Sequence, residues 1–369
     1  MFKKLTAVAV SLCLMPTAVY ALGTSAESSI VINADTRQVL YKDNAYKRLG
    51  IASTTKIMTA IIALENGSTD DIMTVSENAQ NQEGSSIYLR TGDKILLGDL
   101  LYGLMLNSGN DAAVAIAEGI GETTEKFVKM MNDKAQEIGC TNTHFNNPNG
   151  LSDPEHYSTA YDMALIMAYA MENDEFRQIV STKEYQIKNE SSVTYLRNHN
   201  KLLWQYEGCI GGKTGFTKAT GRCLVSCSER EGVRIIAVTL NDRDDWKDHR
   251  NLFDYGFENL KKVKVIQKND ILCTRKIRGI KVNLLSNEDF SISLENGKKR
   301  DLSCRVYLDE AVNDEIHFGT KLGYADVFVG DYKVGSIELI SGQKVNANRA
   351  SVFRDNINYM LRFVLLNKK

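Results

Sequence analysis

The chain contains 369 residues, of which 43% are apolar and 25% are charged, so it has the composition of an ordinary globular protein and the length of two or three domains. Its 45 lysines and arginines almost balance its 46 aspartates and glutamates, and the formal net charge is −1. This balance argues against a nucleic-acid-binding protein, and we expect no nucleic acid among its partners. The cysteines and histidines lack the spacing of a zinc site, and we expect no metal and no cofactor.

The N-terminus has the pattern of a secretory signal peptide. Lys3 and Lys4 precede an apolar stretch over residues 5–18, and Val19 and Ala21 supply small residues at the −3 and −1 positions of a cleavage site. The pattern predicts a signal peptide over residues 1–21, cleavage after Ala21 and export of the mature chain. An uncleaved membrane anchor is the alternative, but the apolar stretch is shorter than the roughly 20 residues that a transmembrane helix needs.

The next part of the chain predicts two strands and then a run of helices. Apolar residues in 28–44 flank a polar turn at 33–36, which is typical of two short strands. From Ser53 onward, apolar residues recur at helical spacing. The expected helices begin at Ser53 and at residues 97, 111, 123 and 159, and a loop is expected over 140–158.

Strand patterns return after residue 206. They cover residues 207–216, 221–230 and 232–242, and a closing helix is expected over 244–260. Helices enclosed by strands at both ends of a segment indicate one α/β (α+β) domain, which we place at residues 22–262.

Beyond residue 262 the pattern changes to short alternating segments separated by glycine and asparagine, such as "FSISLE" at 290–295. This predicts a small all-β domain over residues 263–345.

The last segment, residues 346–369, has a different pattern again. Apolar residues recur at helical spacing from Phe353 to Val364, polar residues lie between them, and the chain ends in Lys368 and Lys369. We expect an amphipathic helix that binds the membrane surface, because the chain is exported and the segment is terminal and basic. The alternative is a terminal helix that packs on the protein itself.

Six cysteines remain after residue 21, and they are scattered rather than arranged as a disulfide framework. Cys223 and Cys227 cannot bridge if they lie on one strand, because four residues span about 13 Å there and a disulfide needs Cα atoms within about 7 Å. We expect free, partly buried thiols at all six positions: Cys140, Cys209, Cys223, Cys227, Cys273 and Cys304.

Ser53-Thr54-Thr55-Lys56 places a serine one helical turn before a lysine, which suits either a helix cap or a nucleophile with its base. The pattern alone is weak, since Ser341 and Lys344 have the same spacing. Two further patterns give it weight. Ser108-Gly109-Asn110 lies between two predicted helices, and Lys213-Thr214-Gly215 lies on a predicted strand.

Ser-x-Asn also occurs at 76–78, so that pattern by itself carries almost no information. The order of all three patterns, each in its own structural context, is what is specific. Three such patterns mark penicillin-binding proteins and class A β-lactamases, with an aspartate where this chain has Gly109.

The segments "ADTRQVLYKDNAYKRLGIASTTKIMTA", "LLYGLMLNSGNDAAVAIAE", "NPNGL" with "HYSTAYDMALI", and "GGKTGFTKATGRCLVS" resemble the low-molecular-mass D-alanyl-D-alanine carboxypeptidases of the penicillin-binding protein 5 family. The resemblance covers about residues 28–262. It implies a transpeptidase-like domain with an antiparallel sheet, flanking helices and a helical subdomain, followed by a small β domain and a terminal amphipathic helix.

The resemblance implies a serine carboxypeptidase that removes the terminal D-alanine from peptidoglycan stem peptides. Ser53 would be the nucleophile, and Lys56 would be its base if burial or a nearby cation keeps the amine neutral. Lys213 would supply such a positive field. Asn110 would hold Lys56 and bind a substrate amide, and Ser108 would relay a proton to the leaving amine.

The family comparison also implies the groups that bind substrate. The backbone N–H groups of Ser53 and Phe216 would form the oxyanion hole, next to Gly215. Thr214 and Arg243 would bind the terminal carboxylate, although Arg243 could equally be a surface residue.

Two other residues have simpler explanations. We expect His156 to be a structural hydrogen-bonding residue, and Asp162 to be an acidic residue in the first turn of its helix.

The implied partners are stem peptides, β-lactam antibiotics and the membrane surface, and the implied location is the outer face of the cytoplasmic membrane or, otherwise, the secreted fraction. A β-lactamase is the nearest alternative, but no Glu-x-x-Leu-Asn segment lies between Asn110 and Lys213. A non-catalytic penicillin sensor or wall-binding protein is another, and a transpeptidase or endopeptidase would use the same residues.

Overall fold

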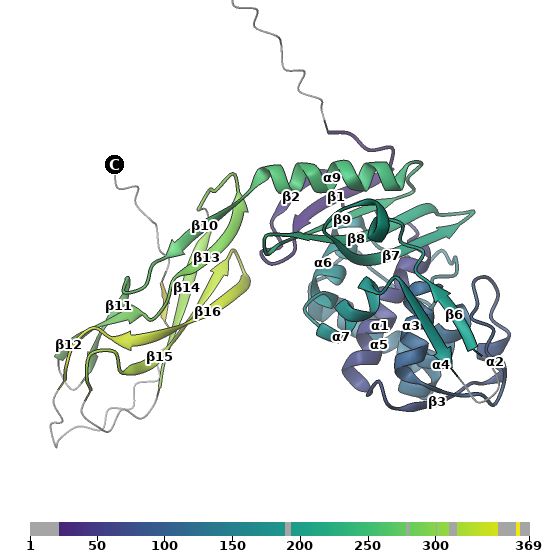
Figure 1. The fold of residues 1–369 in the computed structure, drawn as a ribbon, viewed down its shortest axis with the longest axis horizontal. Coiled ribbons are helices and arrows are strands. Elements are labelled where there is room, and N and C mark those ends of the chain that lie inside the picture. The colour runs from purple at the N-terminus through teal and green to yellow at the C-terminus, as the bar shows by residue number, and fades with distance from the viewer. Residues whose placement is uncertain are drawn as a thin grey trace, which may run out of the picture.

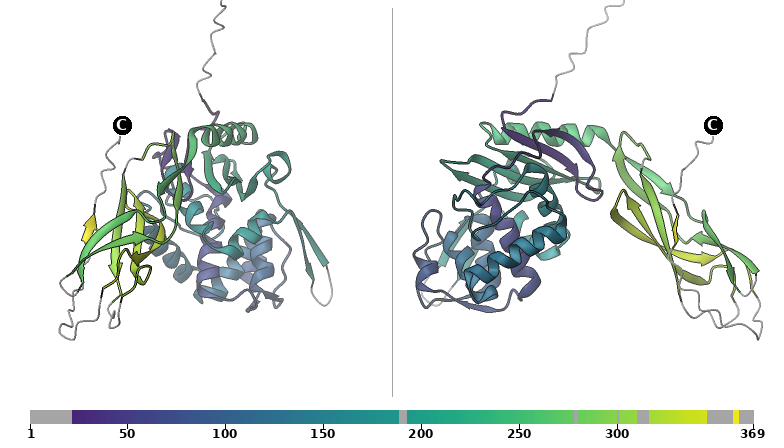
Figure 2. Two further views of the ribbon diagram at one scale, coloured as in Figure 1. Left: turned by 60° about the vertical axis from the view of Figure 1, so that its left-hand side comes forward. Right: turned by 180° about the vertical axis from the view of Figure 1, so that it is seen from behind.

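The computed structural model describes residues 22–188, 193–277, 280–299, 301–309, 316–345 and 359–361. The predicted signal peptide, residues 1–21, lies outside this range. The chain forms a large α/β domain and a separate β domain beside it (Figure 1). The two lie side by side in the other views as well (Figure 2).

The α/β domain is built on a five-stranded antiparallel sheet in the order β2-β1-β9-β8-β7. The strands are β1 (Ser28–Asn33), β2 (Val39–Asp43), β7 (Cys209–Thr217), β8 (Gly221–Arg230) and β9 (Val233–Leu240). Alternate residues face opposite sides, so Ile30 and Ile32 pack with the helical core while Val31 packs with Phe253 of α9 (Asp245–Asn259). The predicted strands on both sides of the helices are therefore confirmed.

Helix α9 lies above the sheet in Figure 1, and the helices of residues 56–181 lie below it. They follow the predicted periodicity: α1 (Lys56–Asn66), α3 (Leu97–Leu106), α4 (Asn110–Gly121), α5 (Thr124–Ile138) and α6 (Ala160–Ala170). The short elements between them are α2 (Glu77–Gln80), α7 (Asp174–Ser181), α8 (Leu202–Gln205), and the hairpins β3 (Ile72–Thr74) with β4 (Lys94–Leu96) and β5 (Glu184–Lys188) with β6 (Val193–Arg197). The sequence patterns did not predict these short elements.

Helix α1 occupies the centre of the domain. Every residue from Lys56 to Ala63 is buried, and the helix contacts α3, α4, α5, α6 and α7. The predicted start of this helix at Ser53 is wrong by one turn. Residues Ala52–Thr55 form a 3₁₀ turn, η1, and the α-helix begins at Lys56.

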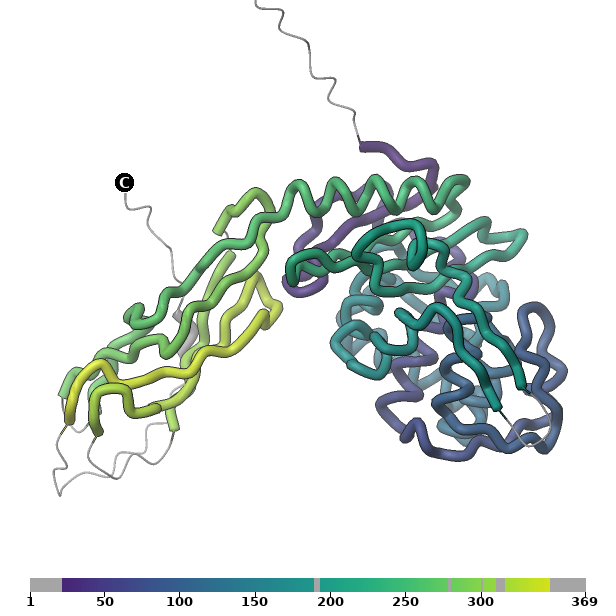
Figure 3. Tube along the Cα trace, in the orientation of Figure 1, coloured from purple at the N-terminus to yellow at the C-terminus, as the bar shows by residue number. Residues whose placement is uncertain are grey.

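The β domain has its own hydrophobic core and begins where α9 ends. Its strands are β10 (Leu260–Ile266), β11 (Ile271–Ile277), β12 (Ile280–Ser286), β13 (Phe290–Glu295), β14 (Leu302–Leu308), β15 (Lys321–Val329) and β16 (Tyr332–Ser341). Figure 3 shows the chain passing directly from α9 into β10, so this strand starts before the predicted boundary at residue 263. The amide of Asn33 donates to Ser293 O over 2.9 Å and joins the two domains.

Of the terminal segment 346–369, the structure describes only β17 (Tyr359–Leu361). This strand pairs antiparallel with β14, with Leu361 opposite Cys304. The predicted helix is therefore wrong at these three residues, and the rest of the segment lies outside the described residues. Within the described part of the chain, no helix is both long enough and apolar enough to span a membrane.

The six cysteines are free, as predicted, and all except Cys209 are buried. Cys223 and Cys227 both lie on β8, where a bridge between them is impossible. Burial raises the pKa of the Cys223 thiol to about 11, so this thiol is a poor nucleophile at neutral pH.

Helix α9 is fixed to the sheet by His249, which is fully buried. Its Nδ1 lies 2.5 Å from Ser226 Oγ on β8, and its Nε2 lies 3.1 Å from Thr239 Oγ1 on β9. Burial lowers the pKa of His249 to about 3, so the ring stays neutral in the folded protein over most of the acidic range.

The pKa of His249 predicts a pH-dependent stability. The unfolded chain takes up a proton below pH 6.5 while the folded chain does not, so the free energy of unfolding falls as the pH decreases from about 6.5 towards 4. At pH 5 the loss from this one residue is about 2 kcal/mol. Urea unfolding at pH 7 and pH 5 measures it, and His249→Asn, although less stable at pH 7, should lose less stability between these two pH values. An equal loss in both proteins would contradict the prediction.

Candidate active site

Ser53 lies in η1, directly before α1, and its side chain caps neither helix. Side-chain hydrogen bonds of Thr55 and His156 stabilise the 3₁₀ turn η1 that carries Ser53. Thr55 Oγ1 donates to Ala52 O over 2.8 Å, and it lies 2.7 Å from His156 Nε2. Because Asn146 N–H donates to His156 Nδ1, the ring proton is on Nε2 and points to Thr55. His156 is thus structural, as predicted, and burial lowers its pKa to about 4.

Lys56 is fully buried one turn beyond Ser53. Its Nζ lies 3.1 Å from Ser53 Oγ, 2.7 Å from Asn110 Oδ1 and 2.6 Å from the backbone carbonyl of Asn149. Burial lowers its pKa well below the usual range, Lys213 lowers it further, and Asp111 opposes the shift.

These three contacts define what Lys56 can do when it is neutral. A neutral amine donates two hydrogen bonds and accepts one. Asn149 offers a carbonyl oxygen, and Asn110 offers Oδ1, since its Nδ2 donates to Glu83 O over 2.6 Å. Only Ser53 has a proton to give, so the free lone pair of Lys56 faces the serine hydroxyl.

Asn110 is the first residue of α4, and Ser108 lies two residues earlier in the turn after α3. Ser108 is buried and has a positive φ of 62°, so the turn is tight. The predicted Ser108-Gly109-Asn110 loop is therefore at the junction of α3 and α4, and it brings Asn110 onto Lys56.

The Lys213-Thr214-Gly215 segment lies on β7, at the edge of the sheet and in contact with η1. Lys213 is buried, which lowers its pKa to about 7, and its Nζ donates to Thr214 O over 2.9 Å. A Cβ on Gly215 would lie only 3.0 Å from the backbone N of Ser53, so the strand passes close to the serine. Phe216 follows and is 64% exposed.

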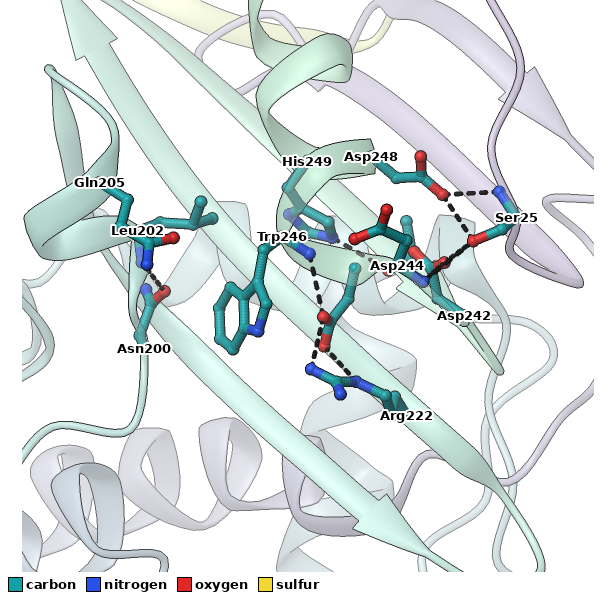
Figure 4. Close-up of polar contacts among 12 residues, drawn as sticks. Ser25, Asn200, Leu202, Gln205, Arg222, Asp242, Asp244, Trp246, Asp248 and His249 are labelled. Atoms are coloured by element: carbon teal, nitrogen blue, oxygen red, sulfur yellow. Dashed lines mark hydrogen bonds and ion pairs between the residues drawn. The ribbon is translucent and has the colours of Figure 1, made fainter.

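Arg243 is the predicted residue whose side chain contacts none of the others among the described residues. It is exposed in the turn between β9 and α9. No ion pair or hydrogen bond of its side chain occurs among the described residues. Figure 4 shows this corner, where Asp242 and Asp248 bind Ser25 and Arg222 pairs with Asp245.

Ser76 and Ser341, the serines of the two additional pattern matches in the sequence, have structural roles. Ser76 caps α2 by accepting a hydrogen bond from Ala79 N–H over 3.0 Å. Ser341 is buried at the end of β16, where its hydroxyl donates to Gln343 O over 2.6 Å. Neither serine is followed by a long helix carrying a lysine.

The loop expected over residues 140–158 supplies the third partner of Lys56, a contact that no sequence pattern indicates. The backbone carbonyl of Asn149 accepts from Lys56, and the side-chain amide of Asn149 donates to Gln82 Oε1 over 2.9 Å. The next residue, Gly150, lies against η1. A Cβ on Gly150 would lie 2.1 Å from Ala52 O. The Asn-Pro-Asn-Gly sequence marks a turn, but nothing in it indicates that a carbonyl points to a lysine.

His199 was also missed. Its backbone N–H donates to Leu106 O over 3.1 Å, close to the Ser108 turn, and burial and Lys213 lower the pKa of its side chain. Among the described residues, no group of three or more His, Cys, Asp and Glu side chains could hold a metal ion.

The structure brings together a serine, a buried lysine, a second lysine on an edge strand and an asparagine at a helix start, which are the groups that acyl transfer by a serine with a lysine base requires. Residues 15–244 match the family model for D-alanyl-D-alanine carboxypeptidase, peptidase family S11, and residues 260–347 match the C-terminal domain of penicillin-binding protein 5. The chain belongs to the D-alanyl-D-alanine carboxypeptidase family.

Comparison with individual relatives leads to the same family. The chain is 33% identical to D-alanyl-D-alanine carboxypeptidase DacF of Bacillus subtilis, over 82% of this chain and 81% of the relative. Penicillin-binding protein 5 from Haemophilus influenzae has the same fold with a TM-score of 0.68 and 26% identity, covering 89% of this chain and 99% of that one. A mutant of the Streptomyces K15 DD-transpeptidase has a TM-score of 0.61 and 34% identity, covering 64% of this chain and 99% of that one.

The contact of Gly150 with η1 predicts that Gly150→Ala displaces Ser53. We expect the rate of labelling by fluorescent penicillin to fall about 100-fold, because a shift of about 1 Å at a reacting group costs that much. Gly139→Ala is the matched control, since Gly139 also has a positive φ but has no atom within 4 Å of the added Cβ. It should lose about 1 kcal/mol of stability and label normally. Equal labelling of the two variants would contradict the prediction.

Proposed function

We propose that this chain is a serine-type D-Ala-D-Ala carboxypeptidase that removes the terminal D-alanine from peptidoglycan stem pentapeptides through an acyl-enzyme on Ser53. The observation that carries the proposal is the geometry of Lys56. Its Nζ is fully buried, lies 3.1 Å from Ser53 Oγ and is otherwise surrounded by acceptors, so the neutral amine can only take a proton from the serine.

In the proposed acylation step, Lys56 removes the proton of Ser53 as Oγ attacks the carbonyl of the penultimate D-alanine. Negative charge develops on the carbonyl oxygen. The N–H groups of Ser53 and Phe216 bind it, and donors placed in this way contribute roughly 3–4 kcal/mol each to the transition state. The closeness of Gly215 to Ser53 N supports this position for the two N–H groups.

The leaving D-alanine takes a proton through Ser108, and Asn110 holds Lys56 and binds a substrate amide. Lys213, Thr214 and Gly215 bind the end of the peptide along the edge of β7, where Lys213 attracts its carboxylate. Arg243 would contribute to carboxylate binding only if its exposed side chain turns towards β7. Water then hydrolyses the acyl-enzyme.

A β-lactam enters the same sequence of steps, and Ser53 opens its ring to give a stable acyl-enzyme. A transpeptidase differs only in the acceptor, an amine instead of water. The similarity to the Streptomyces K15 DD-transpeptidase makes transpeptidation the second candidate.

We predict that Ser53→Ala abolishes D-alanine release from a diacetylated D-Ala-D-Ala tripeptide, with a loss of about 10⁴-fold or more in kcat/KM, because the nucleophile is removed. Labelling by fluorescent penicillin should disappear as well. Ser341→Ala is the matched control, since that serine has the same spacing to a lysine but lies in the β domain. It should keep both activities.

Two results would contradict the carboxypeptidase proposal. Persistent penicillin labelling without D-alanine release in the unsubstituted protein indicates a sensor, or a transpeptidase if an added amine is acylated. Rapid turnover of penicillin indicates a β-lactamase.

We also propose that the chain is exported and that residues 346–369 attach it to the outer face of the cytoplasmic membrane through their apolar and basic residues. We predict that the chain 22–369 floats with vesicles containing phosphatidylglycerol, whereas the chain 22–345 stays in solution. Equal penicillin labelling of both proteins controls for folding. Equal flotation would contradict the proposed role of the segment.

A further inference from the structure

Asp111, the residue after Asn110, carries a buried carboxylate with no exposed surface. Its oxygens accept hydrogen bonds from Ser86 Oγ over 2.6 Å, from the backbone N–H groups of Ile87 and Leu89 over 3.0 and 3.1 Å, and from Ala112 N–H over 2.9 Å. All of these donors are neutral, and Asp111 forms no ion pair within the described part of the chain. A buried charge held in this way by one loop needs an explanation beyond packing.

The same loop, residues 83–89, also holds Asn110. The backbone N–H of Asn110 donates to Ser85 O over 2.7 Å, and its Nδ2 donates to Glu83 O over 2.6 Å. We name residues 83–89 the wall loop. It therefore binds two consecutive residues of α4, and one of them is a direct partner of Lys56.

The wall loop is strained where Asp111 holds it. Tyr88 has a positive φ of 64° and is 86% exposed, while its neighbours Ile87 and Leu89 are buried. A bulky residue rarely adopts this conformation, and it persists only if its surroundings impose it. The hydrogen bonds from both neighbours to Asp111 impose it here.

We propose that Asp111 is a positioning residue of the serine–lysine site, which fixes the wall loop against Asn110 and places a buried carboxylate one residue beyond this partner of Lys56. The proposal rests on the proposed function, because it acts through Lys56 as the base. Neither Asp111 nor the wall loop was among the residues indicated by sequence motifs.

Three ionisable groups surround Lys56. Lys213 on β7 lowers its pKa and Asp111 on α4 raises it, while His156, below η1, is neutral above about pH 4. Asp111 thus opposes the lowering of the Lys56 pKa by burial and by Lys213. Without this charge the pKa of Lys56 falls further, and the amine is deprotonated at a lower pH.

The wall loop has a separate effect. If it detaches, Asn110 Nδ2 loses Glu83 O, and the side-chain amide is no longer held with Oδ1 towards Lys56. Lys56 then loses a fixed partner, and we expect the rate of acylation of Ser53 to fall at every pH.

The variant Asp111→Asn removes the charge and replaces one acceptor oxygen by a donor, at nearly unchanged volume. We would measure the second-order rate of labelling by fluorescent penicillin between pH 5 and pH 9. The expected result is a plateau about tenfold lower, since hydrogen bonds to a charged group are lost. The acidic limb of the profile should move to lower pH by roughly one unit.

Ser86→Ala is the matched control, because it removes one hydrogen bond to Asp111 and leaves the charge in place. It should lower the plateau about threefold without moving the acidic limb. The proposal is overturned if folded Asp111→Asn has the plateau and limb of the unsubstituted protein, or if Ser86→Ala moves the limb equally. Should Asp111→Asn fail to fold, an unchanged plateau in Ser86→Ala overturns it. Failure of the proposed function would be recognised by a different result, because the unsubstituted protein would itself lack carboxypeptidase activity.

Discussion

The burial of one lysine amine is the constraint on which the rest of this structure depends. A charged ammonium is costly to bury, so a fully buried Lys56 gives up its proton far more readily than a lysine in water. Besides Ser53, which lies one turn away, the neutral amine needs acceptors from two distant parts of the chain, Asn110 Oδ1 and the carbonyl of Asn149. The start of α4 and the 140–158 loop must therefore converge on the first turn of α1, and the edge strand β7 passes close to Ser53 beside them.

Much of this fold could be predicted because its periodicity is strong. The apolar helices α3 to α6 and the strands β7 to β9 follow simple spacing rules, and three short patterns in order indicated most of the side chains that meet at the site. What could not be predicted depends on backbone groups. The carbonyl of Asn149 and the N–H groups of the wall loop have no sequence signal, since every residue has them. The 3₁₀ turn at Ser53 was mistaken for a helix start because both have the same local composition.

The end of the chain illustrates a different limit. Helical spacing of apolar residues predicted a helix, yet Tyr359–Leu361 pairs with β14. Three residues carry little periodicity of either kind, and β14 offers an unpaired edge on that side, which an extended segment can cover. Local pattern therefore does not decide between a strand on this edge and a helix elsewhere, because the choice depends on what lies beside the segment.

The arrangement also explains why lysine, and not histidine, is suited to be the base. His156 lies closest to the serine turn, but both ring nitrogens are already used, one by Asn146 N–H and one by Thr55. It supports the turn and has no lone pair left for Ser53. A lysine, in contrast, works as a base only when its pKa is lowered substantially. Burial lowers it most, Lys213 lowers it further, and Asp111 limits the shift, so charges on β7 and α4 adjust a proton affinity that burial has already reduced. The same two elements bind the substrate in the proposed mechanism, and substrate binding and base strength are therefore built from one set of contacts.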